Sequence, residues 1–538
     1  MTSEGSQPKL FARKASGLVR EFGFFDTYIF NTAGYALGLV LASTALLAGA
    51  LYPGANVTTI LILGVCLAAF NGLTYGLLSG AMPRSGGDYV YNGRVLHPAI
   101  GFMTNFGFTC AQILAVGIYA QWTVNYAMSV SFQVIGYGIK SQGLLDLGAY
   151  IAQPVPSLVV GILVIALIVL VHLAGMKFLR KFLNTAIIIA FVGTLVTFFV
   201  FIANTRESFI AAFNQFMSTT TGLADAYQSI IQLAVEKGFT QPPITFGAAL
   251  MALPLGYWMF LGFTNSAYLG GEIKEPQKTQ SYAMIGALLS GFILYIIIFL
   301  AYYNIVGLDF NNSLAYLIYF DQSPLPTDGV MNFFAGLLTN SVFLIIVMGI
   351  SFFLWFFLLE FTIVTVCVRN IFSWSIDRLA PEWLTKVNSK TRAPSNATIF
   401  VGIMGIILLA GSIFTTFLSE ISNFIATWAI AFWITSFSAI LLPFRRKELF
   451  EASPPSVQRK VFGIPLVTIA GIFNLVLFTL VLYAAFTLPL YSGPLGPAAL
   501  AFIFGVYVVG IIIYLIVAGI RKKQGVDLNL LYGEIPPE

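Results

Sequence analysis

The sequence has little charge for its length. Of its 538 residues only 9% are Asp, Glu, Lys or Arg, while 58% are hydrophobic. A soluble protein carries roughly 25% charged residues, so this composition excludes an ordinary soluble domain and indicates a membrane protein. No Gly-x4-Gly-Lys-Ser/Thr loop occurs either, which excludes ATP hydrolysis by that route.

Histidine and cysteine are equally scarce. The two histidines, His97 and His172, lie far apart and form no cluster with cysteine, so we expect no metal centre and no catalytic residues. Cys66, Cys110 and Cys367 lie inside apolar runs and indicate no disulfide framework. The net charge of +5 is distributed over many segments, and we expect no nucleic-acid partner. The basic N-terminus lacks the pattern of a removable signal peptide.

Twelve apolar runs are long enough to cross a bilayer, which takes about 20 residues. The runs cover residues 24–51, 58–80, 99–130, 156–175, 182–202, 244–270, 283–306, 331–368, 396–417, 421–443, 465–488 and 496–520. The sequence therefore predicts an all-α membrane protein with 12 transmembrane helices that contact membrane lipid.

The positions of the basic residues predict the orientation of these helices. If the N-terminus lies inside, only Lys140, Arg206 and Lys237 fall in outer segments, and the other 24 of the 27 basic residues lie on the inner side. Because cytoplasmic loops carry an excess of Lys and Arg, we expect a multi-pass protein of the cell (plasma) membrane with both termini in the cytoplasm.

Two of the runs contain residues that interrupt a helix at mid-depth. They are Asn31, Thr32, Gly34, Ala36 and Gly38 in the first run and Pro254, Trp258, Phe260 and Gly262 in the sixth. A spanning helix breaks only beside protein or a water-filled cavity, and matching breaks in two halves point to a transporter site. The freed N–H and C=O groups suit a carboxylate and an amine. The alternative is that these glycines only allow close helix packing.

Three loop motifs carry a resemblance to a known family. The segment 82–91 reads MPRSGGDYVY, the segment 271–276 reads GEIKEP, and Arg369 precedes DRLAP, KVN and TRAP between residues 377 and 394. Their order and spacing resemble those of the amino acid–polyamine–organocation transporters, over nearly the whole chain.

The resemblance implies two inverted five-helix repeats followed by two extra helices. The expected division is an N-terminal segment 1–23, a first repeat 24–202, an extracellular loop 203–243, a second repeat 244–443, helices 11 and 12 in 444–520, and a tail 521–538. It also implies a substrate pocket between spans 1, 3, 6, 8 and 10, with Trp258 as an aromatic gate. Gln112 and Trp428 are further pocket candidates.

Two departures from the family pattern concern substrate and coupling. Ala36-Leu37-Gly38 stands where the family has Gly-Ser-Gly, and Ala190 stands where proton-coupled relatives have lysine. Glu360 is an acid deep inside a span, where a charge is costly and seldom idle. With Thr362 and Thr365 it is a candidate site for a coupling ion, H+ or Na+. The alternative is a structural ion pair between Glu360 and Arg369.

Charged residues of the inner loops are candidates for gating. Arg84, Asp88 and Arg94 are expected to form a latch on the inner side, and Arg369 and Asp377 belong to the same group. The long outer segments 204–243 and 307–330 read as a cap with short amphipathic helices, or alternatively as a docking surface or lid.

Together these features predict a secondary active transporter, not an enzyme, that imports amino acids. A neutral substrate is favoured because we find no fixed charge in spans 1, 3, 6 or 10. No cofactor is expected, and the sequence leaves the oligomeric state open. The alternatives are an exchanger or exporter of amino acids or polyamines, and a non-transporting membrane receptor on the same fold.

Overall fold

The computed structural model describes residues 20–415, 424–487 and 496–525, together with Leu528 and Tyr532. These residues are almost entirely helical. They include one short hairpin of strands β1 (Lys460–Val461) and β2 (Ile464–Pro465). Most of the expected N-terminal segment 1–23, most of the tail 521–538, and the ends of expected spans 9, 10 and 11 nearest residues 416–423 and 488–495 lie outside the described residues.

Eleven helices of the described chain are long and apolar enough to cross a membrane, which confirms a multi-pass membrane protein. They are α1 with α2 (Phe24–Leu51), the unit of α5, η1 and α6 (Pro98–Gly138), α3 (Val57–Ala81), α8 (Pro154–Leu173), α9 (Met176–Ile202), α14 (Pro276–Val306), α17 (Val342–Ile376), α18 (Ser395–Phe414), α20 (Phe424–Arg445), α23 (Leu466–Thr487) and α24 (Pro497–Lys523). They correspond to all the expected spans except the sixth.

The sixth expected span is not one continuous helix. It consists of α12 (Phe246–Met251), α13 (Leu253–Trp258), an irregular stretch, and the 3₁₀ turns η2 (Asn265–Tyr268) and η3 (Gly270–Glu272). Pro254 has no N–H to donate to the preceding turn, which helps to separate α12 from α13. The sequence predicted this interruption.

The expected eighth span, 331–368, is wrong at both ends. Its first part is a separate short helix, α16 (Met331–Leu337), and the spanning helix α17 begins at Val342 and continues to Ile376. The hydroxyl of Ser341 accepts a hydrogen bond from the N–H of Leu344 (3.5 Å) and so caps the start of α17. Arg369 therefore lies within a helix and not in a loop.

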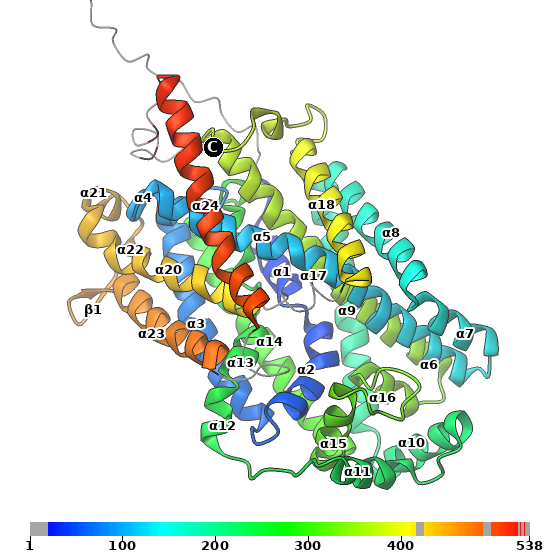
Figure 1. The fold of residues 1–538 in the computed structure, drawn as a ribbon. Helices are drawn as coiled ribbons and strands as arrows, with labels where there is room; N and C mark the ends of the chain where they lie inside the picture. The colour runs from blue at the N-terminus through cyan, green and yellow to red at the C-terminus, as the bar shows by residue number, and fades with distance from the viewer. Residues whose placement is uncertain (1–19, 416–423, 488–495, 526–527, 529–531, 533–538) are drawn as a thin grey trace, which may run out of the picture.

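Long helices surround the two interrupted segments (Figure 1). Helix α17 packs against α9 and α5, α3 packs against α14, and α20 packs against α23. Helix α1 (Phe24–Gly34) contacts both α14 and α17, and η2 contacts α1 and α17. The breaks in the first and sixth segments are therefore enclosed by other helices, as broken helices in a bilayer must be.

The shorter helices gather at the two ends of the bundle. Helices α4 (Asp88–Val95), α21 (Lys447–Glu451) and α22 (Pro455–Gln458) lie at one end, and η4 (Glu382–Thr385) follows α17 there. Helices α10 (Arg206–Thr221), α11 (Ala226–Glu236) and α15 (Leu308–Tyr319) lie at the other end with α16. The expected amphipathic helices of the outer loops are thus present, and α7 (Gln142–Ile151) adds another. We refer to the α4 end as the predicted cytoplasmic end.

Candidate functional site

The first spanning segment breaks between Gly34 and Leu37. Helix α1 ends at Gly34, Ala36 adopts a left-handed conformation with φ of 49°, and α2 (Leu37–Leu51) starts at the next residue. Left-handed backbone is costly for an alanine, so the surrounding packing holds it. The first N–H groups of α2 have no acceptor within their helix, and they are available to an anionic group.

The break in the sixth segment lies directly against the break in the first. Helix α13 ends at Trp258, and Gly262 has φ of +99°. A Cβ atom on Gly34 would collide with the carbonyl oxygen of Gly262, and a Cβ atom on Gly262 would collide with the carbonyl oxygen of Gly34. Only two glycines allow the two backbones this close an approach.

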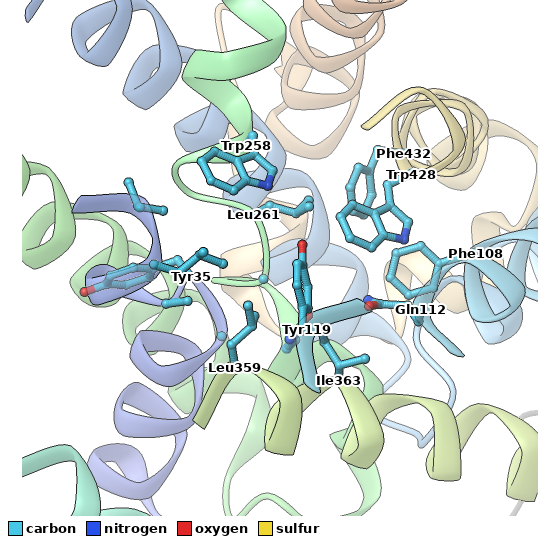
Figure 2. Close-up of a pocket in the computed structure, with 16 residues that line it drawn as sticks. Tyr35, Phe108, Gln112, Tyr119, Trp258, Leu261, Leu359, Ile363, Trp428 and Phe432 are labelled. Atoms are coloured by element: carbon cyan, nitrogen blue, oxygen red, sulfur yellow. The ribbon is translucent and has the colours of Figure 1, made fainter. Parts of the chain in front are cut away.

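A small cavity lies beside this contact (Figure 2). Five regions line it: the first break, α5 (Pro98–Trp122), the second break, α17 and α20. The lining residues are Gly34, Tyr35, Ala36, Leu39, Val40, Phe108, Gln112, Tyr119, Trp258, Leu261, Gly262, Asn265, Leu359, Ile363, Trp428 and Phe432. These regions are the expected spans 1, 3, 6, 8 and 10. None of these lining side chains is an Asp, Glu, Lys, Arg or His.

The cavity is too small to hold a substrate in this conformation. Its volume is about 30 Å³, which corresponds to roughly two water molecules. Figure 2 shows the Trp258 and Trp428 rings on one side, Leu359 and Ile363 on the other, and the Tyr119 ring between them. An amino acid fits only after some of these side chains move apart.

The predicted substrate residues divide into two groups. Gly34, Ala36, Gln112, Trp258 and Gly262 line the cavity, as does the further candidate Trp428. The remaining four, Asn31, Thr32, Gly38 and Phe260, are buried outside its wall.

Three of these four have identifiable packing roles. The side-chain oxygen of Asn31 accepts the N–H of Ser266 (2.9 Å) and so ties the first segment to the sixth. A Cβ atom on Gly38 would lie 2.7 Å from that of Trp355, so this glycine permits close helix packing. The Phe260 ring packs edge-on against Tyr295, with centroids 5.6 Å apart.

Sequence reasoning missed most of the apolar lining. Phe108 and Tyr119 on α5, Leu359 and Ile363 on α17, and Phe432 on α20 face the cavity. These helices are apolar on nearly every side, so the sequence has no polar face against which a pocket face stands out. On these three helices only Gln112, Glu360 and Trp428 marked the turns that lie at or near the pocket.

Glu360 is buried in α17, and neither of its carboxylate oxygens has a hydrogen-bond partner among the described residues. The alternative of an ion pair with Arg369 is wrong, because Arg369 pairs with Glu272 (Nε to Oε1 2.7 Å and Nη2 to Oε2 2.9 Å). An unpaired carboxyl group inside a protein is costly unless it is neutral. The burial of Glu360 without a partner is therefore compatible with a neutral carboxyl group that carries a proton.

The two threonines near Glu360 are hydrogen-bonded within the bundle. Thr362 donates to the carbonyl of Leu359 (2.8 Å), and the side-chain amide of Asn265 donates to the Thr362 hydroxyl (3.5 Å). The Thr365 hydroxyl lies 2.8 Å from Nε2 of His172 and donates to a carbonyl of its own helix. Thr362 therefore touches the second break, whereas Thr365 faces α8.

The predicted gating residues lie at the predicted cytoplasmic end, but they pair differently from the expected latch of Arg84, Asp88 and Arg94. Arg94 binds Asp377 (Nη2 to Oδ2 3.0 Å), and Asn105 donates to Asp88 (2.6 Å). The Arg84 side chain donates to the carbonyl of Pro83 (2.9 Å). The predicted pairing of Arg84, Asp88 and Arg94 is wrong because the sequence does not show which distant side chains meet.

We call the charged side chains at the predicted cytoplasmic end the charged layer: Asp88, Arg94, Glu272, Arg369 and Asp377. Two of its members need a separate description. Glu272, which the sequence did not single out, accepts hydrogen bonds from Nε and Nη2 of Arg369 and joins the end of the sixth segment to α17. Burial raises the pKa of Asp88 to about 7, although the hydrogen bond from Asn105 opposes this. Desolvation destabilises the charged form of a carboxylate, so Asp88 titrates near neutral pH.

A polytopic helical bundle with a closed pocket at two touching helix breaks defines a membrane carrier and not an enzyme. A family sequence model described as "Amino acid permease" matches residues 24–517, nearly the whole chain. The chain therefore belongs to the amino acid permease family. It is similar to the branched-chain amino acid permease BcaP of Bacillus subtilis, with 23% identity over 450 residues that cover 80% of this chain and 83% of that protein. The predicted family and class of activity, amino acid transport, are confirmed.

Proposed function

We propose that this permease imports neutral amino acids across the plasma membrane by alternating access, driven by a proton or sodium gradient. The observation that carries the proposal is the pocket at the contact of Gly34 and Gly262, where free backbone groups meet an apolar lining. In this proposal the chain has 12 spans, two inverted repeats in 24–202 and 244–443, two further helices in 444–520, and both termini in the cytoplasm.

Backbone groups recognise the amino acid's charged ends. The N–H groups at the start of α2, at Leu37 and Gly38, bind the carboxylate, favoured by the positive end of the helix dipole. Carbonyl groups at the end of α1 have no donors within the helix, and they accept hydrogen bonds from the ammonium group. The substrate thus needs no charged side chain in the pocket.

The lining favours an apolar substrate side chain. Leu39, Val40, Leu261, Leu359 and Ile363 supply aliphatic surface, which gains about 25 cal/mol for each Å² it removes from water. A cationic or anionic side chain would lose its hydration there without a partner. The name of the similar permease, which specifies branched-chain amino acids, supports a substrate of this class.

Alternating access accounts for the closed cavity and the charged layer beside it. The ion pair of Glu272 and Arg369 joins the sixth segment to α17 at the predicted cytoplasmic end. We infer that this pair, with Asp377 and its partner Arg94, closes the inner side in the described conformation. Opening requires the Glu272–Arg369 contact to separate and become hydrated.

We assign coupling to Glu360 in α17. Its burial without a partner supports a proton site, and no lysine stands at Ala190 to serve instead. Thr362, two residues after Glu360, contacts the second break through the hydrogen bond from Asn265 to its hydroxyl. A sodium ion held by Thr362, Thr365 and backbone carbonyls is the second arrangement in this proposal.

The test is uptake of radiolabelled leucine and lysine by purified protein in liposomes. We expect leucine to accumulate under an inward proton or sodium gradient, while lysine does not. Trp258→Ala should abolish uptake because it removes a pocket wall, whereas Trp383→Ala, at a tryptophan that is 54% exposed, should not. Preference for lysine would contradict the substrate class, and leucine transport only in exchange for internal substrate would contradict the coupling.

A further inference from the structure

A second cavity lies at the predicted cytoplasmic end, away from the central pocket. It has a volume of about 280 Å³ and lies between the connection from α4 to α5, the end of α20, and Tyr532 near the C-terminus. Four of its lining side chains are basic: Arg94, His97, Arg445 and Arg446. The proposed transport reaction uses Arg94 to close the inner side, but it places no ligand in this space.

The guanidinium of Arg446 is fixed beside the cavity. Its Nε donates to the carbonyl of Arg94 (2.5 Å), and its Nη2 donates to the carbonyl of Tyr532 (3.2 Å). Both partners are neutral oxygens, so the charge of Arg446 is not neutralised by them. An arginine fixed by two hydrogen bonds loses little further conformational entropy when it binds an anion.

Arg94 forms the inner wall of the same cavity. It is 3% exposed, and its Nη2 binds Asp377. Its Nε and Nη1 have no hydrogen-bond partner among the described residues. The Tyr532 ring covers the guanidinium at 4.5 Å, and this contact makes Tyr532 part of the cavity wall.

The charges that the described residues bring to the cavity do not balance. Among these residues, three guanidinium groups, of Arg94, Arg445 and Arg446, meet one carboxylate, that of Asp377. The exposed His97 accepts the N–H of Ala99 through Nδ1 (3.2 Å), so its Nε2 is the ring atom that can donate. The nearby Lys447 adds no free charge because it pairs with Glu451 (3.8 Å). An anion would relieve the excess of positive charge.

We propose that this cavity binds the phosphate group of an anionic ligand. Arginine matches the oxygens of phosphate through paired N–H donors, and three arginines with a histidine provide donors from more than one side. Phe444, next to Arg445, is 67% exposed at the end of a spanning helix, which places the cavity close to lipid. Basic pockets between spanning helices are typical sites for phospholipid headgroups. A headgroup and a soluble phosphate share the required chemistry.

The experiment measures binding to the purified full-length protein with two probes. Native mass spectrometry compares retention of phosphatidylglycerol and phosphatidylcholine, and thermal unfolding compares inorganic phosphate with chloride at equal ionic strength. We expect preferential retention of phosphatidylglycerol or stabilisation by phosphate. Arg445→Gln should weaken the effect roughly tenfold, as expected from one lost charged contact, and Arg445→Lys should weaken it less. The matched control is Lys390→Gln, at an exposed lysine of another loop on the predicted cytoplasmic side.

Each result has a defined meaning. Retention of phosphatidylglycerol without a phosphate effect identifies a lipid headgroup, and a phosphate effect identifies a soluble ligand; both support the site. Arg445 is exposed, so its replacement should not impair folding, which unchanged unfolding in phosphatidylcholine will verify. If neither probe binds preferentially, or if Arg445→Gln and Lys390→Gln behave alike, the proposal is wrong.

Discussion

The central pocket and the charged layer at the predicted cytoplasmic end have opposite chemistry, although two elements contribute to both. The segment from α13 to η3 contributes Trp258 and Gly262 to the pocket and Glu272 to the charged layer. Helix α17 contributes Ile363 to the pocket and Arg369 to the ion pair. From Ile363 to Arg369 the distance along the helix is only about 9 Å, at 1.5 Å per residue.

Because of this difference, the pocket recognises the substrate and the charged layer closes the inner side. Backbone groups and apolar side chains bind a neutral molecule without any charge that must be desolvated. A buried ion pair is stable while both partners are in place, but each ion alone in the interior costs several kcal/mol. The pair of Glu272 and Arg369 therefore favours two states, closed and dry or open and hydrated, and disfavours those between. The predictions below test this separation.

The largest effect is expected where the two breaks touch. In Gly34→Ala the added methyl group would collide with the carbonyl oxygen of Gly262, so the breaks must move apart and the backbone groups that bind substrate are displaced. We expect leucine uptake in liposomes to fall by roughly 100-fold, as misplacement of about 1 Å can cause. Gly505→Ala, where a Cβ meets no atom within 4 Å, is the control and should transport normally.

The next largest effect is expected at the buried ion pair. Arg369→Met leaves Glu272 buried without its partner, which should lower the free energy of unfolding by about 3–5 kcal/mol. Thermal unfolding in detergent measures this change. The double variant Glu272→Gln with Arg369→Met should recover most of the stability but leak substrate, because the inner contact is then weak. A double variant as unstable as the single one would show that packing, not charge, holds this contact.

A smaller effect on stability, but a specific effect on coupling, is expected at Glu360. Glu360→Gln keeps the size of the side chain and removes the ionisable group, so unfolding should change by less than about 1 kcal/mol. Leucine accumulation under a proton gradient should disappear, while exchange of internal for external leucine persists. Unchanged accumulation with an unchanged pH profile would exclude Glu360 as the proton site.

The last effect is expected at Asp88 and is seen only when stability is followed as a function of pH. Its pKa is raised by burial from 3.8 to about 7, so the folded protein binds this proton more tightly than the unfolded chain. Stability should therefore fall as the pH rises from about 4 to 7 and then level off. Asp88→Asn should flatten this part of the curve and raise the melting temperature at pH 8. An unchanged curve between pH 4 and 8 would contradict the shifted pKa.

The sequence predicted more of the central pocket than of the charged layer. It located both helix breaks, because Gly34, Pro254 and Gly262 change the backbone wherever they occur. It grouped Arg369 and Asp377 with the other candidate gating residues, which lie at one end of the bundle, but it assigned a latch of Arg84, Asp88 and Arg94 that the structure replaces with other pairs. Charge pairs depend on which helices meet, and loop composition does not contain that information.

The sequence by itself determined the class of protein and the places of eleven spans, because hydrophobic length and the cost of exposed backbone in a bilayer leave few alternatives. It also determined that the first and sixth segments break. Only the tertiary structure decided that Gly34 and Gly262 touch, that Tyr119 and Ile363 face the pocket, and that Glu272 is the partner of Arg369. On helices that are apolar on every side, the contacts of the fold distinguish a pocket face from a packing face, and no local pattern does so.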